Sequence, residues 1–303
     1  MQQTLLSVGE AMIEMSAGTS GQWRMGFAGD TLNTAAHARA HLGSDWRVSY
    51  FTALGRDRYS AALRAFIEER GIETDRIMTI DDRRPGLYFI HQEDGDRHFT
   101  YWRDRSAARL LASDATALQT AFADVAMIYV SGITLAILDA AGREALFAAL
   151  ETARKSGARI CFDPNIRPVL WSGEEEIRQT LQHFASVCDI VLPTYGDEAG
   201  IFNDKDIAAT RDRYLGWGAR EIVVKNGSEA ALASADGQEV SVDPKPVSTV
   251  VDATGAGDSF NGAYVAARIQ GASLQEAVEK AHQVAAICIG HHGALPSRQT
   301  ADL

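Results

Sequence analysis

Residues 250–260 read Val-Val-Asp-Ala-Thr-Gly-Ala-Gly-Asp-Ser-Phe. The stretch passes from β-branched residues through two glycines into residues 261–269, which are apolar with helical spacing, so it predicts a strand end, a tight turn and a helix start. Gly255 and Gly257 have no Cβ, so their backbone can approach a ligand closely. The amide groups at a helix N-terminus favour an anion such as phosphate, and this turn is therefore a candidate phosphate site.

Asp258 follows in the first turn of the predicted helix. A carboxylate there would repel a bound phosphate unless it has a chemical task, and taking the proton from an attacking hydroxyl is such a task. An Asp at this position can also do no more than cap the helix. The spacing of Asp252 and Thr254 ahead of it favours the catalytic interpretation.

Two common phosphate-binding motifs do not match this stretch. A Walker A loop needs a Lys after its last glycine, and none follows here. The dinucleotide fingerprint needs a third glycine three residues after Gly257, but the next one is Gly262. A nicotinamide-dependent dehydrogenase is therefore poorly supported.

Composition narrows the function classes. The chain has 303 residues, 46% hydrophobic and 23% charged, and a formal charge of −11, which argues against sequence-independent nucleic-acid binding. Cys161, Cys188 and Cys288 are odd in number and far apart, which favours reduced thiols and a cytoplasmic protein. Neither a signal peptide nor an apolar run long enough for a membrane span is expected.

Strand and helix patterns alternate along most of the chain. This alternation predicts an α/β fold with three layers, α/β/α, around a mostly parallel central sheet. The segments 11–28 and 86–103 instead contain short strands outside that rhythm, with a hairpin at Asp94-Gly95. We expect a single domain over residues 1–303, with these two segments forming a small antiparallel lid.

Arginines stand out beside the second lid segment. Arg103, Arg105 and Arg109 are close in sequence, and an arginine fork holds carboxylates, which a sugar acid has and a neutral sugar lacks. The alternative is a solvated basic face partnered by Asp104. Residues 164–168 must be irregular because a proline stands at each end. They follow a predicted strand that ends at Asp163, and open α/β sheets bind ligands at such strand ends.

The run Asp252 to Asp258 resembles the D-[TA]-x-G-A-G-D signature of the ribokinase-like (PfkB) sugar kinases, and the resemblance covers nearly the whole chain. Within that family the chain is most similar to kinases of 2-keto-3-deoxygluconate. The similar segments are Gly29-Asp30-Thr31-Leu32-Asn33, Tyr101-Trp102-Arg103 and the Asp-x-Asn-x-Arg-Pro-x-Leu-Trp run at 163–171. One departure is Ala28, where those kinases carry a second glycine.

The resemblance implies an ATP-dependent kinase that phosphorylates the 6-hydroxyl of 2-keto-3-deoxygluconate. It implies that Asp258 takes the hydroxyl proton while the amides of 255–257 stabilise the moving phosphoryl group. The implied substrate contacts are Gly29, Asp30, Asn33, Tyr88, Tyr101, Arg103, Arg167 and Asp258. The implied nucleotide contacts are Thr194, Lys225, Gly227, Gly255, Ala256, Gly257 and His282.

Cations are implied as well. Most relatives carry Asn-x-x-Glu, whose Glu holds Mg²⁺ through water, whereas this chain has Thr194 followed by Asp197 and Glu198. Either carboxylate could serve the metal, since Mg²⁺ keeps several waters. Asp252 and Thr254 match the part of the signature that binds a monovalent cation, such as K⁺, in relatives. A homodimer through the lid is also implied.

Other functions stay open at this stage. Within the kinase class, the substrate could be fructose, 2-keto-3-deoxygalactonate or another aldonate. In a different class, the chain could be a catalytically silent sugar-binding sensor on the same fold. The intact Asp258 favours an enzyme over the sensor.

Overall fold

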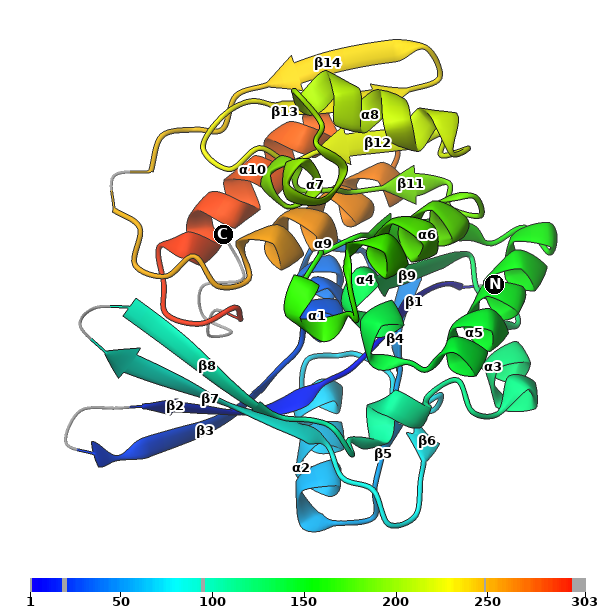
Figure 1. Ribbon diagram of the computed structural model, residues 1–303, viewed down its shortest axis with the longest axis vertical. Coiled ribbons are helices and arrows are strands. Elements are labelled where there is room, and N and C mark those ends of the chain that lie inside the picture. Colours follow the sequence, from blue (N-terminus) through cyan, green and yellow to red (C-terminus); the bar gives the residue numbers. More distant parts are fainter. Residues whose placement is uncertain (1, 18–20, 94–95, 248, 296–303) are drawn as a thin grey trace.

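The computed structural model describes residues 2–17, 21–93, 96–247 and 249–295 (Figure 1). An eight-stranded sheet has the order β14-β13-β12-β11-β10-β9-β1-β4. Its strands are β1 (Gln3–Val8), β4 (Trp46–Phe51), β9 (Met127–Ser131), β10 (Arg159–Asp163), β11 (Ile190–Val191), β12 (Glu221–Val224), β13 (Ala231–Ala235) and β14 (Gln238–Val242). All neighbours pair in parallel except β12 with β13 and β13 with β14. The predicted mostly parallel sheet is confirmed.

Helices cover both faces of this sheet. Successive strand residues point to opposite sides, so Leu5 belongs to one hydrophobic core and Leu6 to the other. One core is closed by α1 (Asp30–His41), α2 (Arg58–Glu68), α9 (Ala256–Ile269) and α10 (Leu274–Ile289). The other is closed by α3 (Ala115–Phe122), α4 (Gly132–Ile137), α5 (Ala140–Lys155), α6 (Glu174–Ala185), α7 (Tyr195–Phe202) and α8 (Ile207–Gly216). The three-layer prediction is confirmed (Figure 1).

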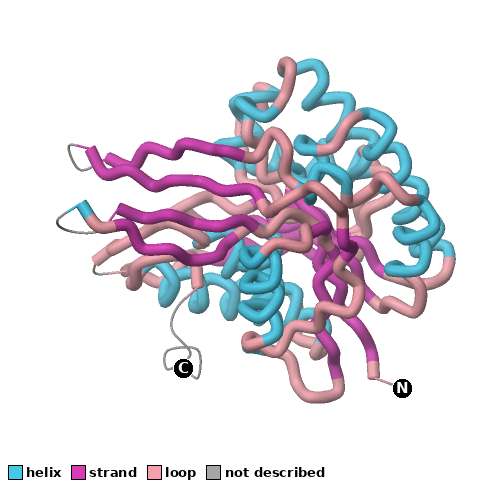
Figure 2. Tube along the Cα trace, turned by 90° about the horizontal axis from the view of Figure 1, so that it is seen from below, coloured by secondary structure: helices cyan, strands magenta, loops and turns pink. Residues whose placement is uncertain are grey.

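The lid is a second sheet of four strands. They are β2 (Met12–Ala17), β3 (Trp23–Ala28), β7 (Gly86–Glu93) and β8 (Asp96–Trp102), in the order β3-β2-β7-β8. The outer pairs are antiparallel, as predicted, whereas the central pair β2–β7 runs parallel. The predicted hairpin residues Asp94 and Gly95 lie outside the described residues. Figure 2 shows the four strands projecting together from one side of the large domain.

Smaller elements join these parts. A two-stranded sheet pairs β5 (Ala53–Leu54) with β6 (Met78–Thr79), and single turns of 3-10 helix lie at Ala107–Leu110 and Pro168–Leu170. The three cysteines are buried and form no disulfide. Within the described ranges, no helix has the length and apolar character needed to cross a membrane.

The signature stretch departs from the prediction at its start. Val250 and Val251 lie outside any strand and are 58% and 41% exposed, so the predicted strand end is wrong. The chain is held here by the amide of Val251, which donates to the carbonyl of Ile289 in α10 (2.8 Å). The predicted turn is present, because Gly255 has φ 78° and ψ 4° immediately before α9. A Cβ on Gly255 would collide with Ala294, so the turn requires glycine.

Candidate active site

Two helices begin at the site. Gly29 precedes α1 and Gly255 precedes α9, and a Cβ on Gly29 would collide with the carbonyl oxygen of Glu10. The first turns of these helices meet where Asn33 Nδ2 donates to Asp258 Oδ2 (2.8 Å). The structure therefore brings together the predicted residues of both helix starts, although more than 220 positions separate them in sequence.

The electrostatics of Asp258 suit a base. Burial, together with the carboxylates of Asp30 and Asp163, raises its pKa to about 7, although the hydrogen bond from Asn33 and the charge of Lys225 act in the opposite direction. Its side chain keeps partial exposure, which a base must have to meet a substrate. Burial also raises the pKa of Asp30. A carboxylate that titrates near neutral pH is well matched to proton abstraction.

The N-terminus of α9 supplies donors for an anion. The first amides of a helix have no partner within it, and they carry the positive end of the helix dipole. The amide of Ala256 makes a long turn bond to the carbonyl of Ala253 (3.3 Å), a weak competitor for a phosphoryl oxygen. Lys225 Nζ lies 3.7 Å from where a Cβ on Gly257 would be. A cation therefore lies beside the predicted phosphoryl site.

A buried polar network below the site escaped the sequence analysis. Asp163 Oδ2 accepts hydrogen bonds from Lys225 Nζ (3.0 Å) and Asn261 Nδ2 (2.6 Å). Asn261 also contacts Lys225 Nζ through its Oδ1 (3.1 Å) and the Tyr129 hydroxyl through its Nδ2 (3.0 Å). Asn261 lies three residues after Asp258, so the two side chains are neighbours on the surface of the helix. This spacing is the signal in the sequence that could have identified Asn261. The network fixes the lysine against the end of β10.

The predicted substrate contacts of the lid face the same region. Tyr88 and Tyr101 are cross-strand partners whose ring centroids are 5.7 Å apart, and the Tyr88 hydroxyl donates to Glu14. Burial raises the pKa of Tyr101, while the charges of Arg103 and Arg167 act to lower it. The guanidinium carbon of Arg103 lies 5.8 Å from the ring centroid of Tyr101. The charge of Asp258 contributes to the raised pKa of Tyr88.

Each of the two arginines also has a carboxylate partner within the chain. Arg103 is 6% exposed and donates from Nη2 to Glu10, a residue that sequence reasoning missed. Arg167 is about half exposed; its Nη1 donates to the carbonyl of Ile166 (2.8 Å) and lies 3.3 Å from Asp197 Oδ2. On the opposite side, Asp30 Oδ2 accepts a hydrogen bond from Asn165 Nδ2 (2.9 Å).

The geometry separates the two candidate metal carboxylates. Glu198 is fully buried, accepting from Arg213 Nη2 (2.8 Å) and the Tyr214 hydroxyl (2.9 Å), and burial raises its pKa to about 7. Asp197 faces the site, where burial raises its pKa, Arg167 lowers it and Asp163 raises it. No group of three potential metal ligands occurs within the described ranges. The structure favours Asp197.

Other predicted nucleotide contacts lie after β11, after β12 and within α10. Thr194 forms an isolated bridge with Lys225, and Gly227 lies in an exposed turn with φ 62°. His282 is half-buried; its Nε2 contacts the carbonyl of Val242 (3.1 Å) and its ring packs edge-on against Phe260. These positions stay predictions.

The proposed monovalent-cation residues are tied into the loop. Asp252 Oδ1 accepts from the amide of Thr254 (2.9 Å), and its Oδ2 accepts from the amide of Gly293 (2.7 Å). A cavity of about 580 Å³ adjoins this loop and is lined by both residues together with Glu14 and Gly26 of the lid. The cavity therefore connects the signature loop to the inner part of the lid.

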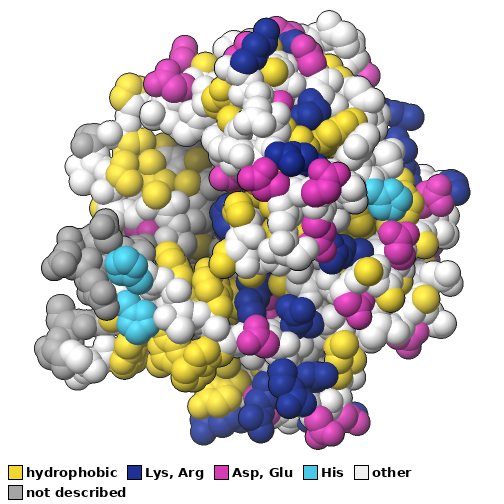
Figure 3. Space-filling view, in the orientation of Figure 1, with side chains coloured by type: hydrophobic (Ala, Val, Ile, Leu, Met, Phe, Trp, Pro, Cys, Tyr) yellow, Lys and Arg dark blue, Asp and Glu magenta, His cyan; other side chains and the backbone are white. Residues whose placement is uncertain are grey.

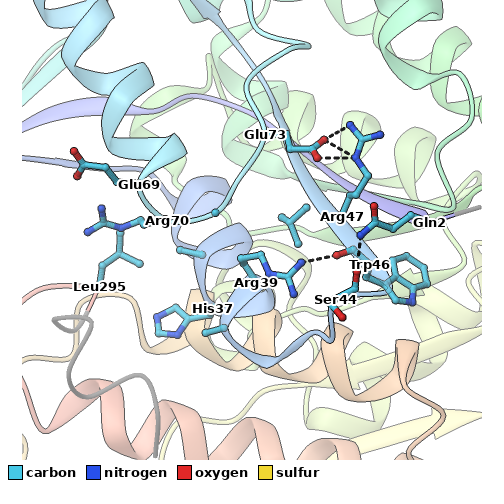
Figure 4. A pocket seen from close by; sticks show the side chains of 14 residues that line it. Gln2, His37, Arg39, Ser44, Trp46, Arg47, Glu69, Arg70, Glu73 and Leu295 are labelled. Carbon is cyan, nitrogen blue, oxygen red and sulfur yellow. Dashed lines mark hydrogen bonds and ion pairs between the residues drawn. The ribbon is translucent and has the colours of Figure 1, made fainter.

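A larger cavity of about 910 Å³ lies at the amino ends of β1 and β4 (Figure 4). Asp258 lies instead near Asp163, at the carboxyl end of β10. Two of the arginines that line the cavity are hydrogen-bonded to nearby protein groups. Arg47 Nε donates to Glu73 (2.7 Å to each oxygen), and Arg39 Nη1 donates to the carbonyl of Trp46 (2.5 Å). It holds none of the predicted site residues.

Comparison with known proteins shows the family of the chain. The family described as pfkB family carbohydrate kinase matches residues 2–301. The chain belongs to this family. Among curated relatives of this pfkB-family chain, the 2-dehydro-3-deoxygluconokinase of Dickeya dadantii is 39% identical over 95% of each chain. The 2-dehydro-3-deoxygluconokinase of Escherichia coli K12 is 34% identical over 99% of each. The fold is shared with the fructokinase of Xylella fastidiosa, solved with bound ATP, at a TM-score of 0.86, 24% identity and coverage of 99% and 97%.

Proposed function

We propose that this protein is an ATP- and Mg²⁺-dependent kinase that phosphorylates the 6-hydroxyl of 2-keto-3-deoxygluconate. The observation that carries the proposal is the position of Arg103, whose guanidinium carbon lies 5.8 Å from the ring centroid of Tyr101, together with Arg167, whose charge also acts on Tyr101. A neutral sugar has no charge to pair with two guanidinium groups, whereas a sugar acid has a carboxylate that can accept hydrogen bonds from them. The names of the relatives in Dickeya dadantii and Escherichia coli support the same substrate.

The residues divide the work of phosphoryl transfer. Asp258 accepts the proton of the attacking hydroxyl, while Asn33 orients its carboxylate through the 2.8 Å hydrogen bond. The amides at the start of α9 and the cation of Lys225 stabilise the charge on the transferring phosphoryl group. Arg103 and Arg167 orient the substrate so that its hydroxyl meets the phosphoryl group in line.

Asp197 fits a magnesium ion better than Glu198 does, because its carboxylate faces the site while that of Glu198 is consumed by Arg213 and Tyr214. It would hold Mg²⁺ through water, and the ion would neutralise charge on the nucleotide phosphates. Gly227 and His282 would lie along the nucleotide, beyond Lys225. Asp252 and Thr254 would bind a monovalent cation beside the signature loop, and a K⁺ titration of turnover that shows no change would remove this part of the proposal.

The test is ADP release with purified protein against neutral sugars, aldonates and 2-keto-3-deoxy acids. We expect 2-keto-3-deoxygluconate to have the highest kcat/KM, with fructose at least tenfold lower. A preference for fructose would contradict the role of the two arginines, and a preference for 2-keto-3-deoxygalactonate would correct the configuration at C4. Sugar binding without ADP release would establish the silent sensor instead.

The lid also favours a homodimer. Three of its exposed apolar side chains, Trp23, Met25 and Trp102, lie on the face of the lid opposite Tyr88 and Tyr101, and they are from 43% to 66% accessible. Hydrophobic side chains gather over the lid in the space-filling view (Figure 3). Burial of such a patch against a second lid would be favourable. Sedimentation equilibrium should give a dimer that Trp102→Glu dissociates; a monomeric wild-type protein would contradict this.

A further inference from the structure

Glu10 lies where the lid leaves the large domain. It falls between β1 and β2, and its carbonyl oxygen occupies the space that a Cβ on Gly29 would need, at the end of β3. Its carboxylate Oε1 is 2.8 Å from where a Cβ on Gly86 would lie, at the start of β7. Its Oε2 accepts from Arg103, immediately after β8. One glutamate therefore contacts the roots of the other three lid strands.

The Glu10–Arg103 pair is buried but only partly satisfied. The two side chains are 1% and 7% exposed. Glu10 Oε1 and Arg103 Nε are buried without a hydrogen-bond partner among the described residues. A buried ion pair seldom adds net stability unless its remaining polar atoms are satisfied, so stability alone does not account for this arrangement. The unfilled donor of Arg103 indicates that the guanidinium is arranged for a partner that binds.

We propose that Glu10 is a positioning residue that orients Arg103 toward the carboxylate of the substrate. This inference rests on the proposed sugar-acid kinase function. The charge-assisted bond to Nη2 fixes the plane of the guanidinium, whose carbon lies 5.8 Å from the ring centroid of Tyr101. Without the Glu10 carboxylate the long side chain of Arg103 can rotate, and a misoriented guanidinium binds the substrate carboxylate less tightly.

A second effect has the opposite sign. The negative charge of Glu10 repels a substrate carboxylate, so its removal alone would favour acid binding. The orientation of Arg103 outweighs this repulsion for two reasons. Arg103 pairs directly with Glu10 and so compensates its negative charge, and Arg167 supplies a second positive charge that acts on the same region. The direction of the change in KM therefore tests the proposal.

Two variants of Glu10 separate orientation from charge. Glu10→Gln keeps the size and removes the charge, whereas Glu10→Asp keeps the charge and withdraws it by about one methylene. We expect both to raise the KM for 2-keto-3-deoxygluconate at least tenfold, with kcat within threefold and the KM for ATP unchanged. The matched control is Glu73→Gln, which removes the partner of Arg47 in the cavity at the amino ends of β1 and β4 and should leave all three constants unchanged.

A double-mutant cycle shows whether Glu10 acts through Arg103. In an Arg103→Lys background, Glu10→Gln should change the KM, or the Kd from calorimetry if turnover is too slow, by less than twofold. An unchanged or lowered KM in the Glu10 variants, or additive effects in the cycle, would overturn the proposal. Failure of the proposed function is distinguishable, because the wild-type protein would then turn over none of the sugar acids.

Discussion

Replacement of Asp258 by Asn should make the protein more stable as well as inactive. A carboxyl group whose pKa is higher in the folded than in the unfolded state destabilises the fold once pH exceeds the unfolded value, because ionisation is then easier in the unfolded chain. The pKa of Asp258 is raised from 3.8 to about 7, chiefly by burial. A difference of about three units corresponds to about 4 kcal/mol. Because Asn33 loses its charged partner, we expect a net gain of about 2–4 kcal/mol.

The gain should depend on pH in one direction. It should be absent near pH 4, grow as pH rises to about 7 and stay constant above that, since wild-type Asp258 is then fully ionised. Urea unfolding of both proteins at pH 5 and pH 8 measures it. The control is Asp114→Asn, which weakens an exposed cap of α3 and should give no gain at either pH. An Asp258→Asn protein no more stable than wild type at pH 8 would refute the assignment of a buried, charge-repelled carboxylate.

Three further predictions concern catalysis. The kcat/KM should rise about tenfold per pH unit below about pH 7 and level off above it, because the ionised form of Asp258 is the base; a profile flat from pH 5 to 8 would contradict this. Arg167→Ala should raise the KM for sugar acids about 10- to 100-fold, and initial rates showing an unchanged KM would remove its carboxylate role. In Mg²⁺ titrations, Asp197→Asn should increase the Mg²⁺ concentration that gives half-maximal rate at least fivefold. Glu198→Gln should leave that concentration within twofold, since Arg213 and Tyr214 hold Glu198, and the reverse pattern would exchange their roles.

Local chemistry made much of this site predictable from sequence. The turn at Gly255 needs a residue that tolerates φ 78°, and the two glycines that flank Ala256 predict such a turn. The lid segments broke the β-α rhythm, and both form the expected strands. The spacing of residues in one turn or one hairpin is a local property, so the sequence displays it directly.

Other features depend on contacts between distant segments. The exposure of Val250 and Val251 could not be foreseen, because β-branched residues suit a strand only where a neighbouring strand is available for pairing. The parallel pairing of β2 with β7 is likewise set by how the two lid segments meet. Glu10 gave no signal of its own, since Arg103 lies 93 positions away.

The two acidic residues of α7 illustrate a third kind of limit. Successive helical residues point about 100° apart, so Asp197 and Glu198 cannot both face the site. Which one does so is decided by how α7 packs against α8, where Arg213 and Tyr214 take up Glu198. The sequence shows that a carboxylate is present, whereas the rotation of its helix decides whether that carboxylate faces the site or the protein interior.

The most direct test of the whole account is the turnover of Asp258→Asn with saturating ATP and 2-keto-3-deoxygluconate. Loss of a general base lowers kcat by about 10²- to 10⁴-fold. We predict a fall in this range with the KM for the sugar acid within about threefold of wild type, because Arg103 and Arg167 are unchanged. A kcat within threefold of wild type would contradict the assignment of Asp258 as the base and with it the proposed mechanism.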